Sequence, residues 1–335
     1  MSPNPAPPAA HPTFTNAHAQ MCTVITAITD AWGADGEAII RHVYRDLGHH
    51  TGAEMIATGV VPAGADLETY GRVSEQIMDT CGLEGWTRVA TDAVEHRTIV
   101  PGCAAYVPLF EYLQAPANIC SLPFEWDNGC LDVINDDLEV WPRSCVYRGA
   151  GECHYVISLR DQDRSQPAQA PTAALPAGTA RPAAAVAVQA EPTWTNPTAG
   201  LLALIGAAVA AYGDEAYAVL RPALHALGAK AGADEVASPA ADAAQIAELI
   251  VRRYRAAGFT EATAVAEADG RWRVDLGHNP YGPVLARFAA HRAAATLFAE
   301  YDDGWATAAP RVDLVTAADG WAAAGQHTFT ISARS

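Results

Sequence analysis

The side chains best suited to chemistry gather in residues 101–159, which hold five of the seven cysteines in the chain. Cys103 follows a predicted strand at the start of the next helix, where exposed amides and the helix dipole lower the pKa of a thiol. Cys120 comes 17 residues later, and the carboxyl groups of Glu125 and Asp127 follow it closely. A covalent hydrolase or lyase needs such a set, because sulfur attacks an electrophilic carbon while a carboxyl group moves the proton. His154 is a further candidate for proton transfer.

These thiols have two other interpretations. Free cysteine is among the most frequently buried residue types, and Cys22, Cys81 and Cys145 fall at core positions of predicted helices or strands. The second alternative is a zinc site, whose ligands would come from Cys103, Cys120, Cys130, Cys153 and His154. The chain has none of the closely spaced cysteine pairs that are typical of structural zinc sites. We therefore predict no cofactor and keep zinc as the alternative.

The reactive segment belongs to one copy of an internal repeat. The motifs AWG and AIIR at 31–41 recur 180 residues later as AYG and AVLR. Further on, EWDNG at 125–129 recurs as EYDDG at an offset of 175, and Gly-x-Cys at 151–153 recurs as Gly-x-His at an offset of 174. A drift of six residues places the length changes in loops. The pattern predicts a tandem duplication of one domain of about 140 residues.

The two copies differ in their thiols but agree in their carboxylates. All seven cysteines precede residue 154, and by offset Cys103 and Cys120 pair with His278 and Ala295. The carboxylates Glu125 and Asp127 instead have counterparts, Glu300 and Asp302. Retention in both copies is compatible with a structural and with a functional role, so both interpretations stay open. We expect the first copy to be active and the second to be a degenerate partner.

Hydrophobic periodicity predicts an α+β fold with two tandem homologous domains, each with helices packed on a small antiparallel sheet. For the first copy we expect helices over 31–52 and 66–81, strands over 86–91 and 96–100, a mainly helical stretch over 104–132, and a closing hairpin of 138–147 and 153–159. For the second we expect helices near 200–230, 242–257 and 283–300, and strands near 260–276, 311–317 and 326–333.

Composition sets the domain boundaries and excludes some partners. We predict a flexible leader over 1–17, a cysteine-containing domain over 18–160, a Pro/Ala-rich linker over 161–193 and the repeat over 194–335. A net charge of -17 argues against nucleic acid as a partner. We expect no membrane partner, because the longest apolar run is too short to cross a bilayer. With no secretory signal visible, we predict a cytoplasmic protein with reduced thiols.

The order of Cys103 after a strand, Cys120 before an acid, and Gly151-Glu152-Cys153 opening the last strand resembles the L-2-amino-thiazoline-4-carboxylic acid hydrolase-like family. The resemblance covers about 20–160, and about 195–333 only through the repeat. It implies hydrolytic opening of a small ring that contains sulfur and nitrogen, or a related reaction on another small carboxylate. Carried over by residue, Cys103 and Cys120 are the thiol positions and Asp127 or Glu125 is the acid. The closing hairpin also resembles 4-vinyl-reductase-type ligand-binding domains.

Two functions follow from these observations. The first is a cysteine-dependent hydrolase or lyase that acts on a small heterocyclic or carboxylate substrate in specialised metabolism. The alternative is a non-catalytic small-molecule-binding protein of 4-vinyl-reductase-like fold, since loss of reactive groups from one copy is natural for a binder. In both cases the partner is a small molecule, and we expect the two repeats to pack on each other as a pseudo-dimer.

Overall fold

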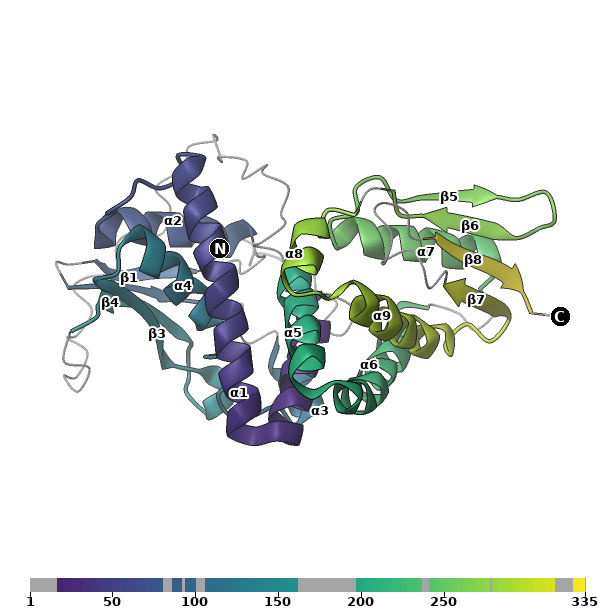
Figure 1. Cartoon of the computed structure of the whole chain (residues 1–335), viewed down its shortest axis with the longest axis horizontal. Helices are drawn as coiled ribbons and strands as arrows, with labels where there is room; N and C mark the ends of the chain where they lie inside the picture. The colour runs from purple at the N-terminus through teal and green to yellow at the C-terminus, as the bar shows by residue number, and fades with distance from the viewer. Residues whose placement is uncertain are drawn as a thin grey trace, which may run out of the picture.

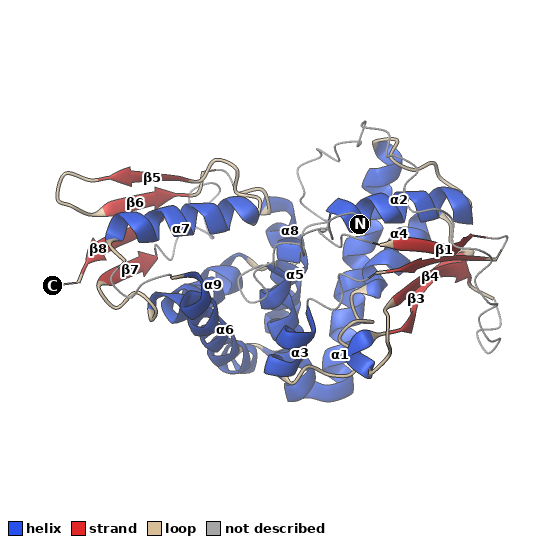
Figure 2. Cartoon of the chain, turned by 180° about the vertical axis from the view of Figure 1, so that it is seen from behind, coloured by secondary structure: helices blue, strands red, loops and turns tan. Residues whose placement is uncertain are grey.

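The computed structural model describes residues 17–80, 86–91, 94–100, 106–161, 197–236, 241–277, 279–316 and 328–334. These residues form a mixed α+β structure of helices and two small antiparallel sheets. The sheets lie at opposite ends of the molecule, with helices between them (Figures 1 and 2). The predicted leader up to residue 16, most of the predicted linker, Cys81 and Cys103 lie outside the described residues.

The N-terminal half (17–161) packs helices on one face of a four-stranded sheet. Its elements are α1 (Ala17–Ala57), α2 (Leu67–Thr80), β1 (Thr87–Thr91), β2 (Glu95–Ile99), α3 (Val107–Leu113), α4 (Phe124–Ile134), β3 (Leu138–Ser144), a 3-10 turn (Val146–Arg148) and β4 (His154–Leu159). The strand order is β1-β2-β4-β3, with every neighbouring pair antiparallel. Side chains alternate across β4, so Tyr155 and Ile157 pack in the core that also contains Val140 of β3.

The C-terminal half (197–334) has the same order of elements. These are α5 (Pro197–Tyr212), α6 (Asp214–Glu235), α7 (Ala243–Ala256), β5 (Thr263–Ala266), β6 (Trp272–Asp275), α8 (Gly282–Arg287), α9 (His291–Ala306), β7 (Val312–Thr316) and β8 (Thr328–Ala333). The strand order, β5-β6-β8-β7, matches that of the first sheet element by element. The helices and strands therefore lie close to where hydrophobic periodicity predicted them.

The one difference in helix count comes from a glycine that both halves share. Inside α1, Gly33 has φ 53 and ψ -126, so the helix turns sharply there. Gly213, which separates α5 from α6, has nearly the same angles, φ 56 and ψ -129. A side chain would be strained in this conformation, which explains glycine at both positions. The predicted helix over 31–52 is thus the second arm of a longer bent helix.

The two halves meet at these bends and along the adjoining helices. The ring of Trp32, just before the first bend, stacks on the ring of Tyr212 at a centroid distance of 3.9 Å and an interplanar angle of 5°. A salt bridge from Arg287 to Asp46, at 2.7 Å, joins α8 to α1. Buried side chains of α1, α5 and α6 belong to one continuous hydrophobic cluster, so the halves share a core. No helix in the described ranges is long and apolar enough to cross a membrane.

Two helix crossings, one in each half, bring backbones into direct contact. A Cβ on Gly48 of α1 would lie 2.0 Å from the carbonyl oxygen of Trp126, and one on Gly129 of α4 would lie 2.2 Å from that of Arg45. In the second half, Gly228 of α6 and Gly304 of α9 have the corresponding distances of 2.1 Å to the oxygens of Tyr301 and His225. The glycines of the repeated motifs are therefore needed because only hydrogen fits between the helices.

One stretch is less helical than predicted. Residues 104–132 contain α3 and α4, but turns occupy Pro116–Pro123 between them. Two prolines bound this segment, and neither can donate a helical hydrogen bond. The segment places Cys120 in a connection rather than on a helix.

We predict that Gly48→Ala lowers the free energy of unfolding by roughly 3 kcal/mol, because the added methyl group forces α1 away from α4. Chemical denaturation with urea measures this loss. Gly151→Ala is the matched control, since its Cβ meets no atom within 4 Å. A Gly48→Ala variant as stable as the control would show that the crossing tolerates a side chain.

Candidate functional site

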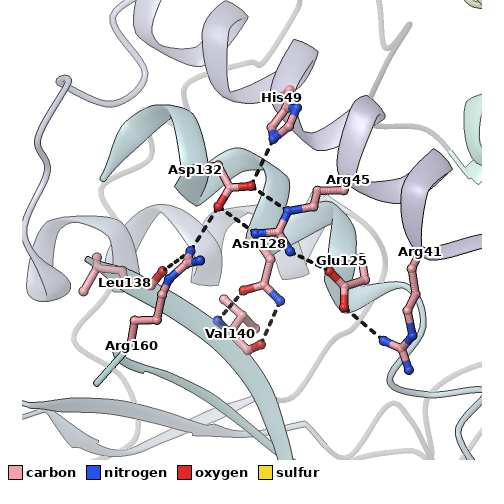
Figure 3. Close-up of polar contacts among 9 residues, drawn as sticks. All are labelled: Arg41, Arg45, His49, Glu125, Asn128, Asp132, Leu138, Val140 and Arg160. Atoms are coloured by element: carbon pink, nitrogen blue, oxygen red, sulfur yellow. Dashed lines mark hydrogen bonds and ion pairs between the residues drawn. The ribbon is translucent and has the colours of Figure 1, made fainter. Parts of the chain in front are cut away.

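The repeated EWDNG motif begins α4, and its first residue attaches that helix to α1. Glu125 accepts a hydrogen bond from Arg41 at 3.0 Å and one from Arg45 at 3.1 Å (Figure 3). Arg45 also binds both oxygens of Asp132, one turn further along α4 than the motif. These ion pairs hold the Glu125 carboxylate against α1, so it has a structural role.

Two further motif residues also have structural roles. The Asn128 amide donates to the carbonyl oxygen of Val140 at 3.1 Å and accepts from its N–H at 2.8 Å, which ties α4 to β3 (Figure 3). Gly129 lies in the α1–α4 crossing. The motif is therefore retained mainly because it holds α4 against both α1 and the sheet.

Asp127 takes no part in these contacts of the motif with α1 and β3. Its carboxylate accepts a hydrogen bond from the hydroxyl of Tyr155 on β4 at 2.8 Å. The residue as a whole is half-buried. Desolvation by the surrounding protein nevertheless raises the pKa of Asp127 to about 7. A carboxyl group with a pKa near neutrality is suited to act as a general acid or base.

A cluster of thiols, Cys22, Cys120, Cys145 and Cys153, comes from four different segments of the N-terminal half. Cys120 is half-buried, and the other three are buried. Burial and a hydrogen bond with the Cys145 thiol raise the pKa of Cys120, and Cys153 and Cys22 lie close enough to contribute. Burial also raises the pKa of Cys22 to about 12. At neutral pH these two thiols are therefore protonated.

Strand β4 connects the thiol cluster to Asp127. Cys153 immediately precedes β4, and Tyr155 is its second residue. Residues two apart in a strand point to the same face and are separated by about 7 Å. Cys153, beside Cys120, and Tyr155, bonded to Asp127, thus share one face of the sheet. His154 points to the other face, where its Nε2 lies 3.3 Å from Glu152.

The predicted site residues therefore separate into three groups. Cys120 and Asp127 lie on the same side of β4. Glu125 is held by arginines of α1, and His154 is on the opposite face of the sheet. Cys103 lies outside the described residues, so its place in the site stays a prediction.

The corresponding carboxylate in the second half is closed off. Asp302 is fully buried, forms a salt bridge with Arg253 of α7 and accepts a hydrogen bond from Tyr254 at 3.2 Å. The Arg253 guanidinium carbon lies 5.3 Å from the ring centroids of Tyr254 and Tyr301 and 5.1 Å from that of Trp305. Burial raises the pKa of Asp302 to about 6, against the opposing effect of Arg253.

Sequence reasoning missed Tyr155, Tyr70 and Arg253. Tyr70 is fully buried, and Asp127 and Cys130 are close enough to raise the pKa of its hydroxyl. Tyr155 lies two residues after Cys153 in a predicted strand, and this spacing could have placed it on the same face as that cysteine. Arg253 lies in an ordinary amphipathic helix, so only the tertiary structure reveals that it is paired with Asp302.

Within the described residues, no group of three or more His, Cys, Asp or Glu side chains is arranged to hold a metal ion. The zinc alternative that includes Cys103 extends beyond those residues. Comparison of the chain with family models, curated proteins and solved structures finds no match.

We predict that Asp127→Asn stabilises the protein more at pH 8 than at pH 5. The folded pKa of about 7 exceeds the unfolded value of about 3.9. Between these two pH values the Asp127 carboxyl group stays protonated in the native state but ionises in the unfolded state, so the protein loses stability as the pH rises. Asparagine removes this loss of stability, which amounts to roughly 2.6 kcal/mol between pH 5 and pH 8. Urea denaturation at the two pH values measures the difference.

Asp132→Asn is the matched control for this experiment. Hydrogen bonds from Arg45, His49 and Arg160 outweigh desolvation and lower the pKa of Asp132 to about 2. Its stabilisation is complete above the unfolded pKa of about 3.9, so the variant loses similar stability at pH 5 and pH 8. A pH-independent effect of Asp127→Asn would contradict the raised pKa.

Proposed function

We propose that the N-terminal half is a cysteine-dependent hydrolase or lyase that acts on a small heterocyclic or carboxylate substrate. The observation that carries the proposal is Asp127, a half-buried residue whose carboxyl group has a pKa of about 7 and which shares a face of β4 with a thiol cluster. The proposed nucleophile is the thiol of Cys103 or Cys120. The resemblance to the amino-thiazoline hydrolase-like family supports the same reaction class.

The proposed chemistry uses one thiol and one carboxyl group. The Asp127 carboxylate accepts the proton of the attacking thiol, and the new sulfur–carbon bond displaces a ring nitrogen or sulfur, which takes the proton from Asp127. Water then attacks the same carbon, the bond from that carbon to the cysteine sulfur breaks, and the proton of the water returns through Asp127 to the released sulfur. A base is needed because burial keeps the Cys120 thiol protonated at neutral pH.

The first test is turnover of L-2-amino-thiazoline-4-carboxylic acid, followed by loss of the intact ring on liquid chromatography. We expect Asp127→Asn to lower kcat by about 100-fold or more, since a general acid–base contributes about 100- to 10,000-fold. Asp136→Asn, an exposed carboxylate near the end of α4, is the matched control and keeps full activity. Unchanged turnover in a variant that lacks Asp127, or in one that lacks both Cys103 and Cys120, would refute the proposed roles.

A second candidate function is non-catalytic binding, favoured by a cavity between the two halves. The cavity has a volume of about 230 Å³, and α1 contributes Gln20 to its lining. The C-terminal half supplies an apolar and aromatic wall, including Leu249, Phe259, Phe298 and Tyr301. Such a site suits a small aromatic ligand.

Alkylation with iodoacetamide at pH 7, followed by peptide mass spectrometry, distinguishes the two functions. The catalytic function predicts one rapidly modified thiolate. We expect it at Cys103, because burial raises the pKa of Cys120 and Cys22. Cys103→Ser then removes the fast phase, and Cys22→Ser, at a buried thiol, preserves it. Slow modification of every thiol favours the binding function.

We also infer that the two halves are tandem homologous domains. Support comes from the matching strand orders, the matching angles of Gly33 and Gly213 and the glycine crossings at equal positions. The stack of Trp32 on Tyr212, its counterpart 180 residues later, is the contact that a pseudo-twofold pair makes near its axis.

A further inference from the structure

The two halves treat the same carboxylate differently. Asp127 and Asp302 occupy the same place in their repeated motifs, and both lie on the helix that crosses the long bent helix of their half. Asp302 is fully buried and paired with Arg253, whereas Asp127 is half-buried and forms no ion pair with any described residue. An internal cation therefore pairs with one carboxylate, and no described cation pairs with the other.

The position of Arg253 explains this difference. Helix α7 begins at Asp242 and α2 begins after Asp66, and each aspartate accepts a hydrogen bond from the backbone three residues later. Counted from these caps, the residue in α2 that corresponds to Arg253 is Ile77, which has no charge. The guanidinium that closes the second site thus has no counterpart in the first.

A second polar group near Asp127 is the hydroxyl of Tyr70. The Tyr70 hydroxyl is buried and has no hydrogen-bond partner among the described residues. Leaving such a group unpaired costs about 1–3 kcal/mol, so a partner supplied by a ligand would recover that energy. Asp127 and the Tyr70 hydroxyl together offer acceptors for two donors.

We propose that Asp127 binds a guanidinium- or amidinium-type group of a small ligand, in the role that the Arg253 side chain plays beside Asp302. One N–H of the planar cation donates to the Asp127 carboxylate and another donates to the Tyr70 hydroxyl oxygen. The rings of Tyr155 and Phe124, which contact each other at a centroid distance of 5.3 Å, provide an aromatic surface like the one around Arg253. This inference rests on the proposed small-molecule site at Asp127 and specifies the charge of what it binds.

The titratable groups near Asp127 set the expected pH dependence. They are Tyr155 of β4, Tyr70 of α2 and Cys130 of α4, and burial raises the pKa of all three, so they stay neutral between pH 6 and pH 8. Of these described groups, Asp127 is the one that changes charge in this interval, from mainly protonated to mainly ionised. The affinity for a cation therefore rises with pH.

The test is isothermal titration of the full chain with benzamidine, an aromatic amidinium, and with benzamide, its neutral isostere. We expect benzamidine to bind about tenfold more tightly at pH 8 than at pH 6, because the ionised fraction of Asp127 increases by about that factor. Asp127→Asn should abolish the binding, and Asp132→Asn, whose carboxylate is paired on the other side of α4, should preserve it. Equal binding of benzamide, binding retained by Asp127→Asn, or no binding by the wild-type chain would overturn the inference.

A second variant tests the idea without altering Asp127. Arg253→Ala removes the internal guanidinium from Asp302, and methylguanidinium chloride should then raise the melting temperature of this variant by more than that of the wild-type protein, in which the Asp127 site alone is open to it. N-methylurea is the neutral control. No difference between the two compounds would count against a free cation replacing Arg253.

The outcomes also separate this inference from the proposed reaction. Benzamidine binding without ring-opening activity would support the cation site and refute the enzyme. Activity that depends on Asp127, together with no affinity for benzamidine, would support the enzyme and refute the cation site.

Discussion

The close crossing of two helix pairs constrains everything else in this molecule. Where Gly48 of α1 meets Gly129 of α4, and where Gly228 of α6 meets Gly304 of α9, the backbones are too close for any side chain. The crossing fixes the rotation of α4 and α9 about their axes. Each helix therefore presents the aspartate of its repeated motif toward the core, and the ion pairs of α4 with α1 and of α9 with α6 remain on the other side. The position of Asp127 follows from backbone contact rather than from its own interactions.

The residues of the repeated motif in α4 differ in their roles. Glu125 and Asn128 have all their strong contacts with α1 and β3, which explains the retention of Glu125 as Glu300 without any catalytic role. Asp127 contributes nothing comparable to the scaffold. Its desolvation opposes folding at neutral pH, because the native state must hold a carboxylate away from water without a cation. A group that is retained in both halves despite such a cost is a stronger candidate for function than one that stabilises the fold.

Periodicity was sufficient for most of the fold because each helix and strand carries its own apolar pattern. The bend at Gly33 escaped detection, since a single glycine is compatible with both a continuous and a broken helix. The site was harder to predict. Sequence proximity suggested that Glu125 would serve the same site as Asp127. Residues two positions apart on a helix, however, point in directions that differ by about 200°. Proximity also suggested His154, which strand alternation places on the far face from Tyr155. Tyr70 and Arg253 come from helices distant in sequence, and no local pattern marks them.

The repeat helps to interpret the site because it shows two solutions to one electrostatic problem. A buried carboxylate must be protonated, hydrogen-bonded or paired with a cation. The C-terminal half pairs Asp302 with an internal cation, Arg253, which lies against three aromatic rings. The N-terminal half leaves Asp127 with one hydrogen bond, partial access to solvent and a pKa near neutrality. The same scaffold thus supports a closed structural pair in one half and an open, titratable group in the other. Since the thiols also occur only in the open half, the asymmetry of the carboxylates and the asymmetry of the cysteines point to the same half as the seat of function.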